Sequence, residues 1–292
     1  MDKINTLKIT KQIMSQNQIY AKKAYGQNFL IDDNVLEEIV NAVNITDEDL
    51  VIEIGPGLGN LTHYILNKGA NVLAFEIDKD VIEILNKRFE NQMERLKIVN
   101  QDILDVDITE YMGEYQNVKI IANLPYYITT PIIFKLFEYK DKIDEIVIMV
   151  QKEVADRILS KPKSKEYSVL TITTNYLCDT SRVVDVPNSS FIPAPNVNSS
   201  VIKLKINKNK VKNYGILDEK TFKSTVKAAF FARRKKMLNS IILSGALQIS
   251  KSELEEIFNS HDISLNSRAE EISIGDYALI SNAIYTKNTL NR

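Results

Sequence analysis

Hydrophobic residues follow two different periods along the chain between residues 30 and about 150. Short apolar, β-branched runs typical of buried strands alternate with stretches in which apolar residues recur every three or four positions, as on one face of a helix. The first helix has Asp32 or Asp33 at its start, where a carboxylate can cap free backbone N–H groups. This alternation indicates a mostly parallel sheet with helices on both faces. The predicted strands cover residues 50–54, 71–75, 96–99, 118–121 and 145–150, with helices before the first strand, from about residue 61 and around residues 81–85.

The pattern changes after residue 165. Residues 167–178 and 199–206 are predicted as longer strands that form an antiparallel pair closing the sheet, and the charged residues 207–214 are predicted as a linker. Helical periodicity returns over residues 221–243 and 251–258. We therefore predict three parts, which are a mobile N-terminal tail over residues 1–20, an α/β domain over residues 21–207 and a small all-helical domain over residues 208–292.

Composition narrows the class of protein. Of the 292 residues, 44% are hydrophobic and 26% are charged, which is typical of globular proteins. No run of 18 apolar residues occurs, and the N-terminus lacks the apolar core of a secretory signal. The single cysteine, Cys178, excludes a disulfide framework, and only two histidines accompany it, too few ligands for structural zinc. We expect a cytoplasmic, metal-free monomer with no membrane partner.

The net charge of −1 hides an asymmetry along the chain. Residues 1–207 carry a net charge of −6 and residues 208–292 carry +5, and the window 203–236 contains 12 basic residues against 2 acidic ones. This concentration favours a polyanionic partner at one end of the molecule. The alternative is a lysine-rich surface that is merely solvated, and charge alone does not separate the two.

A glycine-rich loop follows the strand predicted over residues 50–54. It has the sequence Glu53-Ile-Gly55-Pro-Gly57-Leu-Gly59 and leads into a helix. Glycines there allow a sharp turn and a close approach of the backbone to a ligand. The spacing is GxGxG and not the GxGxxG of dinucleotide sites, which suits a ligand without a pyrophosphate. We expect the Glu53 carboxylate to face a cationic end of this ligand.

Acidic residues also follow the next two predicted strands. Glu76 can hold both hydroxyls of a ribose, and Asp102 can bind an adenine amino group. A structural glycine turn with surface carboxylates is the alternative, and three such features at three consecutive strand ends weigh against it. The three together predict a binding site for S-adenosylmethionine.

The tetrapeptide Asn123-Leu124-Pro125-Tyr126 follows the fourth predicted strand, at the edge that faces this site. The Asn123 side-chain oxygen and the Leu124 carbonyl can accept the N–H bonds of an exocyclic amine, which frees its lone pair to attack a methyl sulfonium. Pro125 stiffens the turn, and Tyr126 offers a face on which an extruded base can stack. We predict transfer of a methyl group to a planar amine, with positioning as the main source of rate.

Taken together, these motifs resemble the ribosomal RNA adenine-N6 dimethyltransferase family. They are EIGPGLGNLT, FEID, QDILDVD and NLPYYITTPI, with KKAYGQNFLID at 22–32, FIPAPNVNS at 191–199, FFARRKKML at 230–238 and RAEEISIGDYALI at 268–280. The resemblance covers about residues 18–282, and the last segment is similar to the bacterial small-subunit 16S branch. It implies a Rossmann-like class I S-adenosylmethionine-dependent methyltransferase sheet with its last strand antiparallel. One departure is Asn196, where the family commonly has a lysine that could contact phosphate.

The resemblance also implies roles for particular residues. A segment containing Asn28 and Leu30 covers the cofactor, Gly55 lies along its methionine part and Asn123 lies at its methyl group. Glu76 and Asp102 keep the ribose and adenine roles given above. Phe191 is implied to hold the target base against Tyr126, as a pair of aromatic rings can do without reading sequence. The residues expected to contact RNA phosphates are Lys22, Lys23, Arg233, Arg234 and Lys235, the last three on a basic helix.

The leading hypothesis is an enzyme that dimethylates N6 of two adjacent adenosines in the 3′-terminal hairpin of 16S rRNA, within the small ribosomal subunit. The nearest alternative is the related enzyme that methylates a 23S rRNA adenosine and confers macrolide-type resistance. A mainly non-catalytic assembly factor of the small subunit is an alternative of another class. A nucleotide-binding dehydrogenase is disfavoured, because GxGxxG is absent and NLPY is present.

Overall fold

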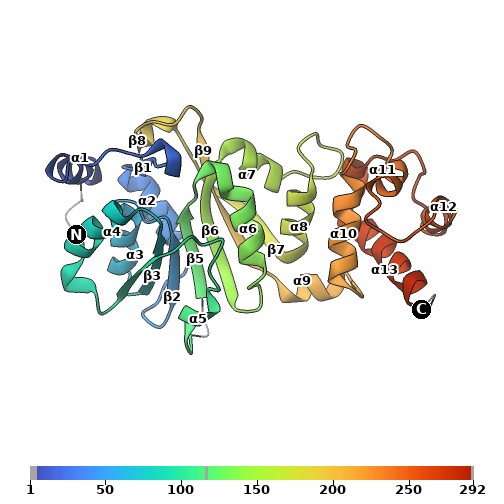
Figure 1. Ribbon diagram of the computed structural model, residues 1–292, viewed down its shortest axis with the longest axis horizontal. Coiled ribbons are helices and arrows are strands. Elements are labelled where there is room, and N and C mark those ends of the chain that lie inside the picture. The colour runs from blue at the N-terminus through green and yellow to red at the C-terminus, as the bar shows by residue number, and fades with distance from the viewer. Residues whose placement is uncertain (1–4, 116–117, 291–292) are drawn as a thin grey trace. The chain divides into compact units, whose positions relative to one another are not determined.

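The computed structural model describes residues 5–115 and 118–290, except for the side chain of Lys23. Its chain separates into two compact units, which Figure 1 shows in one view. The sheet unit comprises residues 1–155 and 181–206, and the helical unit comprises residues 156–180 and 207–292.

A seven-stranded sheet forms the centre of the sheet unit, in the order β4-β3-β2-β5-β6-β9-β7. Its first five strands are parallel, and β9 runs antiparallel to β6. A separate two-stranded sheet pairs β1 with β8. The strands are β1 (Phe29–Leu30), β2 (Leu50–Ile54), β3 (Asn71–Glu76), β4 (Leu96–Asn100), β5 (Val118–Asn123), β6 (Ile143–Gln151), β7 (Cys178–Val186), β8 (Phe191–Ile192) and β9 (Ser199–Ile206). The predicted parallel sheet with an antiparallel final strand is confirmed.

Alternation along the strands divides the core of the sheet unit into two faces. Val51, Ile121 and Val147 belong to a cluster with the apolar faces of helices α2 to α4. Their neighbours, such as Ile52, point to the opposite face, where Phe75 meets Tyr111 of α5 edge to face. The helices that begin in this unit are α1 (Thr6–Gln16), α2 (Asp33–Asn41), α3 (Asn60–Asn67), α4 (Lys79–Arg88), α5 (Thr109–Met112), α6 (Thr129–Phe137) and α7 (Lys152–Ile158).

The helical unit includes a segment that the pattern assigned elsewhere. A strand was predicted over residues 167–178, but residues 169–177 form helix α8. The strand in this region, β7, begins at Cys178. The β-branched residues of this segment favour a strand, but a capping box between Ser168 and Thr171 starts a helix that packs on α10. Its helices are α8 (Val169–Leu177), α9 (Lys208–Asn213), α10 (Glu219–Ala229), α11 (Met237–Ser244), α12 (Lys251–Ser260) and α13 (Ile274–Leu290). Residues 156–180 therefore belong to the same unit as the C-terminal helices, whereas the predicted division at residue 207 placed them in the α/β domain.

Three further predictions differ from the structure. The linker over residues 207–214 is largely helix α9, which Asn207 caps. The single helix over residues 221–243 is two helices, because residues 230–236 form a turn in which Ser240 Oγ accepts from the Ala232 N–H. The prediction of a mobile tail is wrong for residues 6–16, which form helix α1 with Thr6 and Thr10 buried. Residues 1–4 lie outside the described part of the chain.

Candidate active site

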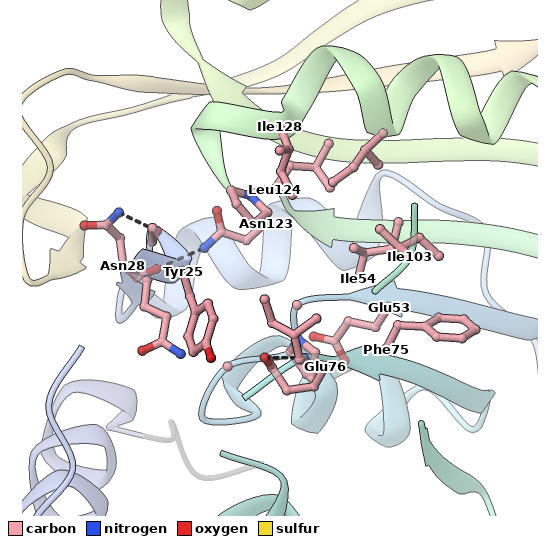
Figure 2. A pocket seen from close by; sticks show the side chains of 18 of the residues that line it. Tyr25, Asn28, Glu53, Ile54, Phe75, Glu76, Ile103, Asn123, Leu124 and Ile128 are labelled. Carbon is pink, nitrogen blue, oxygen red and sulfur yellow. Dashed lines mark hydrogen bonds between the residues drawn. The ribbon is translucent and has the colours of Figure 1, made fainter. Parts of the chain in front are cut away.

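The strand order places a cleft at one edge of the sheet, within the sheet unit. β2 and β5 are neighbours that lead to opposite halves of the sheet, and ligands bind at such points in α/β proteins. The cleft holds about 1020 Å³ of empty space, part of it open to solvent. Figure 2 shows side chains that line it. Most of the lining comes from residues 25–30, 53–58, 75–77, 101–103 and 123–128.

The three glycines after β2 serve two purposes. All have positive φ, with values of +66° at Gly55, +54° at Gly57 and +81° at Gly59. A Cβ on Gly55 would have only the Asn123 backbone oxygen within 4 Å, at 3.9 Å, so this backbone borders open space in the cleft. A Cβ on Gly59 would lie 2.5 Å from the Phe89 ring. The first glycine therefore leaves room for a ligand, whereas the third allows α3 to pack on α4.

Two buried carboxyl groups stand next to each other beside this loop, Glu53 at the end of β2 and Glu76 at the end of β3 (Figure 2). Burial raises the pKa of Glu53 to about 8, although Thr62 donates a hydrogen bond to it over 2.6 Å. Burial also raises the pKa of Glu76, whose Oε1 accepts from the N–H groups of Ile77 at 2.8 Å and Asp78 at 2.9 Å. Both carboxyls gain from a cationic or hydroxyl-bearing ligand, as the roles predicted for Glu53 at a cationic end of the ligand and for Glu76 at a ribose require.

Asp102 lines the cleft beyond Glu76, after β4. Its Oδ1 accepts from the Leu104 N–H at 2.9 Å, which fixes a tight turn. The residues after these two acids, Ile77 and Ile103, also line the cleft. Each strand end thus supplies one acceptor and one apolar side chain, which is the environment that a polar-edged, flat adenine ring requires.

Asn123 ends β5 with its side chain fixed by the segment opposite (Figure 2). Its Nδ2 donates to the backbone oxygen of Asn28 at 3.1 Å, and because a carbonyl only accepts, this bond sets the orientation of the amide. The Leu124 N–H donates to Met149 at 3.2 Å. Among the hydrogen bonds within residues 5–115 and 118–290, none ends on Asn123 Oδ1 or the Leu124 oxygen. Two acceptors therefore remain for a ligand amine.

Pro125 and Tyr126 also line the cleft, as predicted for the tetrapeptide. The Tyr126 hydroxyl and the Ser199 Oγ lie 2.6 Å apart, so β9 holds the ring in place. Partial burial raises the pKa of Tyr126. Tyr127, which the motif analysis passed over, is 59% exposed and lines the same cleft. The tyrosine pair in the sequence was the signal that could have identified it.

Residues 22–30, which we name the cover segment, form one wall of the cleft. Asn28 and Leu30 line it together with Tyr25. Gln27 Nε2 donates to Asp78 at 2.9 Å. The structure thus gathers all seven residues predicted for the cofactor into one cleft: Asn28, Leu30, Gly55, Gly57, Glu76, Asp102 and Asn123.

Lys22 was predicted to contact RNA, but its side chain binds two carboxylates of the chain itself. Its Nζ lies 2.7 Å from a carboxylate oxygen of Asp78 and 2.7 Å from one of Asp80. The hydrogen bonds to Asp78 and Asp80 raise the pKa of Lys22. Its charge is thus already compensated within the chain, and its contacts fasten the cover segment to the start of α4. The side chain of Lys23 lies outside the described residues.

Phe191 is not brought to the cleft. It pairs with Leu30 in the small β1–β8 sheet and is 3% exposed, within the apolar cluster of the sheet unit. The implied sandwich of a base between Phe191 and Tyr126 is therefore not assembled in this structure. Spacing along the chain cannot reveal such burial, because it depends on the antiparallel pairing of segments 160 residues apart.

The basic residues after Phe230 lie in a turn of the helical unit, and not on the predicted helix. Arg233 donates to the backbone oxygen of Lys165, which joins the turn to the loop 160–166. Within the described residues, no ion pair involves Arg234 or Lys235. We name the exposed group formed by both segments the basic surface: Lys161, Lys163, Lys165, Phe231, Arg233, Arg234, Lys235 and Lys236. The sequence analysis missed its loop lysines, which lie about 70 residues away in the chain, and it missed Phe231, which is 66% exposed.

Other reactive side chains lie away from the cleft. Cys178 is buried, and burial raises the pKa of its thiol to about 12. His63 pairs with Asn67 on α3. Within the described residues, no group of three or more His, Cys, Asp or Glu side chains could hold a metal ion. Among the same residues, the helices are all too short or too polar to cross a membrane.

Comparison with known proteins agrees with this site. A family described as "Ribosomal RNA adenine dimethylase" matches residues 19–286. A Clostridioides difficile protein named "Ribosomal RNA small subunit methyltransferase A" is 42% identical over 290 residues, which cover 98% of this chain and 99% of that protein.

Solved structures show the same fold. A dimethyladenosine transferase from Plasmodium falciparum has a TM-score of 0.72 at 24% identity, covering 86% of this chain and 95% of that one. The 23S rRNA methyltransferase ErmE has a TM-score of 0.65 at 20% identity, covering 88% and 100%. The sheet is that of a class I S-adenosylmethionine-dependent methyltransferase, as predicted.

Proposed function

The chain belongs to the ribosomal RNA adenine dimethylase family, and on that premise we propose that it dimethylates N6 of two adjacent adenosines in the 3′-terminal hairpin of 16S rRNA. It is an S-adenosylmethionine-dependent rRNA methyltransferase. Assignment to the small subunit follows the name of the 42% identical relative. The observation that carries the chemistry is the fixed amide of Asn123, whose oxygen is left to the cleft.

The residues of the cleft fit the cofactor in three places. Glu76 would bind the ribose hydroxyls and Asp102 the adenine amino group, while the space beside Gly55 takes the methionine part. Glu53 faces the charged end of the cofactor, as expected from its position beside the glycine loop. When bound, S-adenosylmethionine supplies an electrophilic methyl group, and its sulfur keeps the electron pair of the broken C–S bond.

The chain then positions the adenine amine for attack. Asn123 Oδ1 and the Leu124 oxygen accept its two N–H bonds, so the nitrogen lone pair turns out of the ring and forms the new N–C bond. The extra proton on nitrogen passes to water. For the second methylation one N–H remains, and one acceptor suffices to hold it. The rate acceleration comes from the positioning of the amine and from the two fixed dipoles, which are the side-chain amide of Asn123 and the carbonyl of Leu124.

Two aromatic rings, Tyr126 and Phe191, hold the base. Tyr126 is fixed by Ser199 and offers one ring face. Phe191 can take the opposite side only if the β1–β8 sheet moves, because it is buried in the present conformation. Binding of RNA would then expose Phe191, and the base would replace its apolar neighbours.

The basic surface docks RNA. Its seven cations are exposed, and arginine and lysine contact phosphates without reading sequence. Phe231 lies among them and is positioned to stack on an unpaired base. We further propose that the chain acts as a monomer on the small subunit or its precursor in the cytoplasm.

The test is transfer of radiolabelled methyl groups to unmodified 30S and 50S subunits, followed by nucleoside analysis. Label in 16S rRNA as N6,N6-dimethyladenosine is expected. Label in 23S rRNA instead would place the chain with the resistance enzymes. Binding of 30S subunits without any label, despite cofactor binding, would make it an assembly factor.

A further inference from the structure

Helix α1 contacts the cofactor side of the sheet unit, although its sequence fits none of the motifs above. Asn5 caps it through a bond to the Lys8 N–H at 2.9 Å. Its inner face contains Thr6 and Thr10, which are 2% and 0% exposed, and Ile13 and Met14 pack against the apolar core. A helix with fully buried hydroxyls must satisfy them with particular partners. The partners of Thr10 lead into the active site.

Asn60 joins α1 to the cover segment. Its Nδ2 donates to Thr10 Oγ1 at 2.9 Å and to the backbone oxygen of Leu30 at 2.8 Å. Its Oδ1 accepts from Arg88 Nη1 at 3.0 Å, and the same nitrogen donates to the backbone oxygen of Leu58 in the glycine loop. One amide, 6% exposed, thus connects α1, the cover segment, α4 and the glycine loop.

Two of the three bonds fix the amide, because each of these two excludes the flipped orientation. Arg88 can only donate and the Leu30 carbonyl can only accept, so Oδ1 must face the arginine and Nδ2 the carbonyl. Thr10 binds the second N–H. Without the Thr10 hydroxyl, one N–H in a buried site has no partner, and its uncompensated desolvation weakens the hold of the amide on the Leu30 oxygen.

We infer that Asn60 is a positioning residue for the cofactor, and that α1, through Thr10, holds it in the orientation that ties the cover segment to the glycine loop. The segment has a second attachment at its other end, where Lys22 and Gln27 bind Asp78. That attachment is partly exposed, whereas the one at Asn60 is buried. The Asn60 end is therefore the attachment that solvent does not reach.

The experiment compares Thr10→Val with Thr6→Val and Thr10→Ser. Both valine variants remove a buried hydroxyl of α1, but the Thr6 hydroxyl donates to Asp33, whereas the Thr10 hydroxyl accepts from Asn60. The readouts are the Kd and dissociation rate of S-adenosylhomocysteine, measured by calorimetry and stopped flow, together with the urea midpoint. None of these three readouts needs RNA, so a failure of this inference can be distinguished from a failure of the proposed RNA substrate.

Thr10→Val is expected to raise the Kd of S-adenosylhomocysteine about tenfold, mainly through faster dissociation. Thr10→Ser and Thr6→Val should stay within about twofold of the unmodified protein, although Thr6→Val lowers the urea midpoint comparably. An equal rise of Kd in both valine variants, or a loss of stability with unchanged Kd in Thr10→Val, would overturn the inference. Should Thr10→Val not fold, Asn60→Ala at 10 °C must show at least the same rise in Kd, and an unchanged Kd there rejects the proposal.

Discussion

The active-site cleft and the basic surface are built in opposite ways. In the cleft, Glu53 and Glu76 are 1% and 6% exposed, and Asn123 is held by one defined bond. On the basic surface the cations are exposed, and Arg234 and Lys235 have no ion pair among the described residues. The cleft is preorganised by burial, whereas the surface relies on charge that solvent still reaches.

The difference follows from what each region must do. Methyl transfer depends on the position of one nitrogen to a fraction of an ångström, so its acceptors must be fixed before the substrate arrives. Phosphate binding gains energy from released counterions and tolerates many arrangements of side chains. Mutations in the cleft should therefore act on rate or cofactor affinity, and those on the surface should act on salt-dependent affinity.

The largest effect is expected for Asn123→Ala. It removes one of the two acceptors that bind the N–H groups of the adenine amine and free its lone pair. Loss of a single fixed dipole of this kind costs roughly 10²–10³-fold in kcat. The Kd for S-adenosylhomocysteine should change by less than about fivefold, since other groups bind the cofactor. Single-turnover methylation of 30S subunits and calorimetry measure the two quantities. Exposed Asn67→Ala on α3 is the control, and a kcat within tenfold in Asn123→Ala would refute the assigned role.

A smaller effect, on cofactor affinity, is expected for Glu76→Gln. The amide oxygen can still accept from Ile77 and Asp78, so the local turn survives. Loss of the charge weakens hydrogen bonds to the ribose, and bonds to charged groups contribute about 1.5–3 kcal/mol, or roughly 10–100-fold in Kd. Titration with S-adenosylmethionine tests this. An unchanged Kd would remove Glu76 from the ribose site.

On the basic surface, Arg234→Ala and Lys235→Ala should each weaken RNA binding about tenfold at low salt. Removing one bound phosphate partner should also flatten the slope of log affinity against log salt by about 0.7–0.9.

Phe231→Ala should weaken binding by about 1–3 kcal/mol with no change of slope, because stacking releases no counterion. Lys251→Ala and Leu243→Ala, exposed on α12 and α11, are the controls. A slope change in Phe231→Ala, or none in the charge variants, would contradict the proposed surface.

The buried carboxyl of Glu53 predicts a pH dependence of stability. Its pKa rises from 4.5 in the unfolded chain to about 8 on folding, so the folded protein holds this proton more tightly. The stabilisation of the folded state by the proton on Glu53 is fully present below pH 4.5, and it is lost as the pH rises to 8. Glu53→Gln removes this loss, so its stability relative to the unmodified protein should increase with pH across that window, by about 1.4 kcal/mol per pH unit. Urea unfolding at several pH values tests it, with exposed Glu90→Gln as control; a constant difference would exclude a raised pKa.

The smallest effect is expected for Lys22→Ala. Because Lys22 already pairs with Asp78 and Asp80, its removal should leave the salt slope of RNA binding unchanged. The Kd for S-adenosylhomocysteine should rise only about two- to fivefold, since exposed ion pairs contribute little. Exposed Lys11→Ala on α1 serves as the control. A flatter salt slope in Lys22→Ala would restore this residue to the RNA contacts and blur the distinction between the two regions.

Sequence reasoning located the cleft because its residues follow consecutive parallel strands. The carboxyl ends of such strands share one edge of the sheet, so Glu76, Asp102 and Asn123 had to converge once the strands were recognised. The strand over residues 50–54 agrees with β2 to the residue. Periodicity failed at residues 169–177, where β-branched residues form a helix because α10 covers it and a capping box starts it.

The parallel sheet, the order of the motifs and the chemistry available at each strand end were predictable from local patterns, since these depend on neighbours a few residues apart. Four features were not predictable in this way: α1 is folded, Lys22 is paired, Phe191 is buried and Asn60 links α1 to the cover segment. Each of these rests on contacts between residues about 50 or more positions apart, such as Asn60 with Thr10 and Lys22 with Asp78. Local propensity carries no information about such partners, because burial and packing select them only when the whole chain is folded.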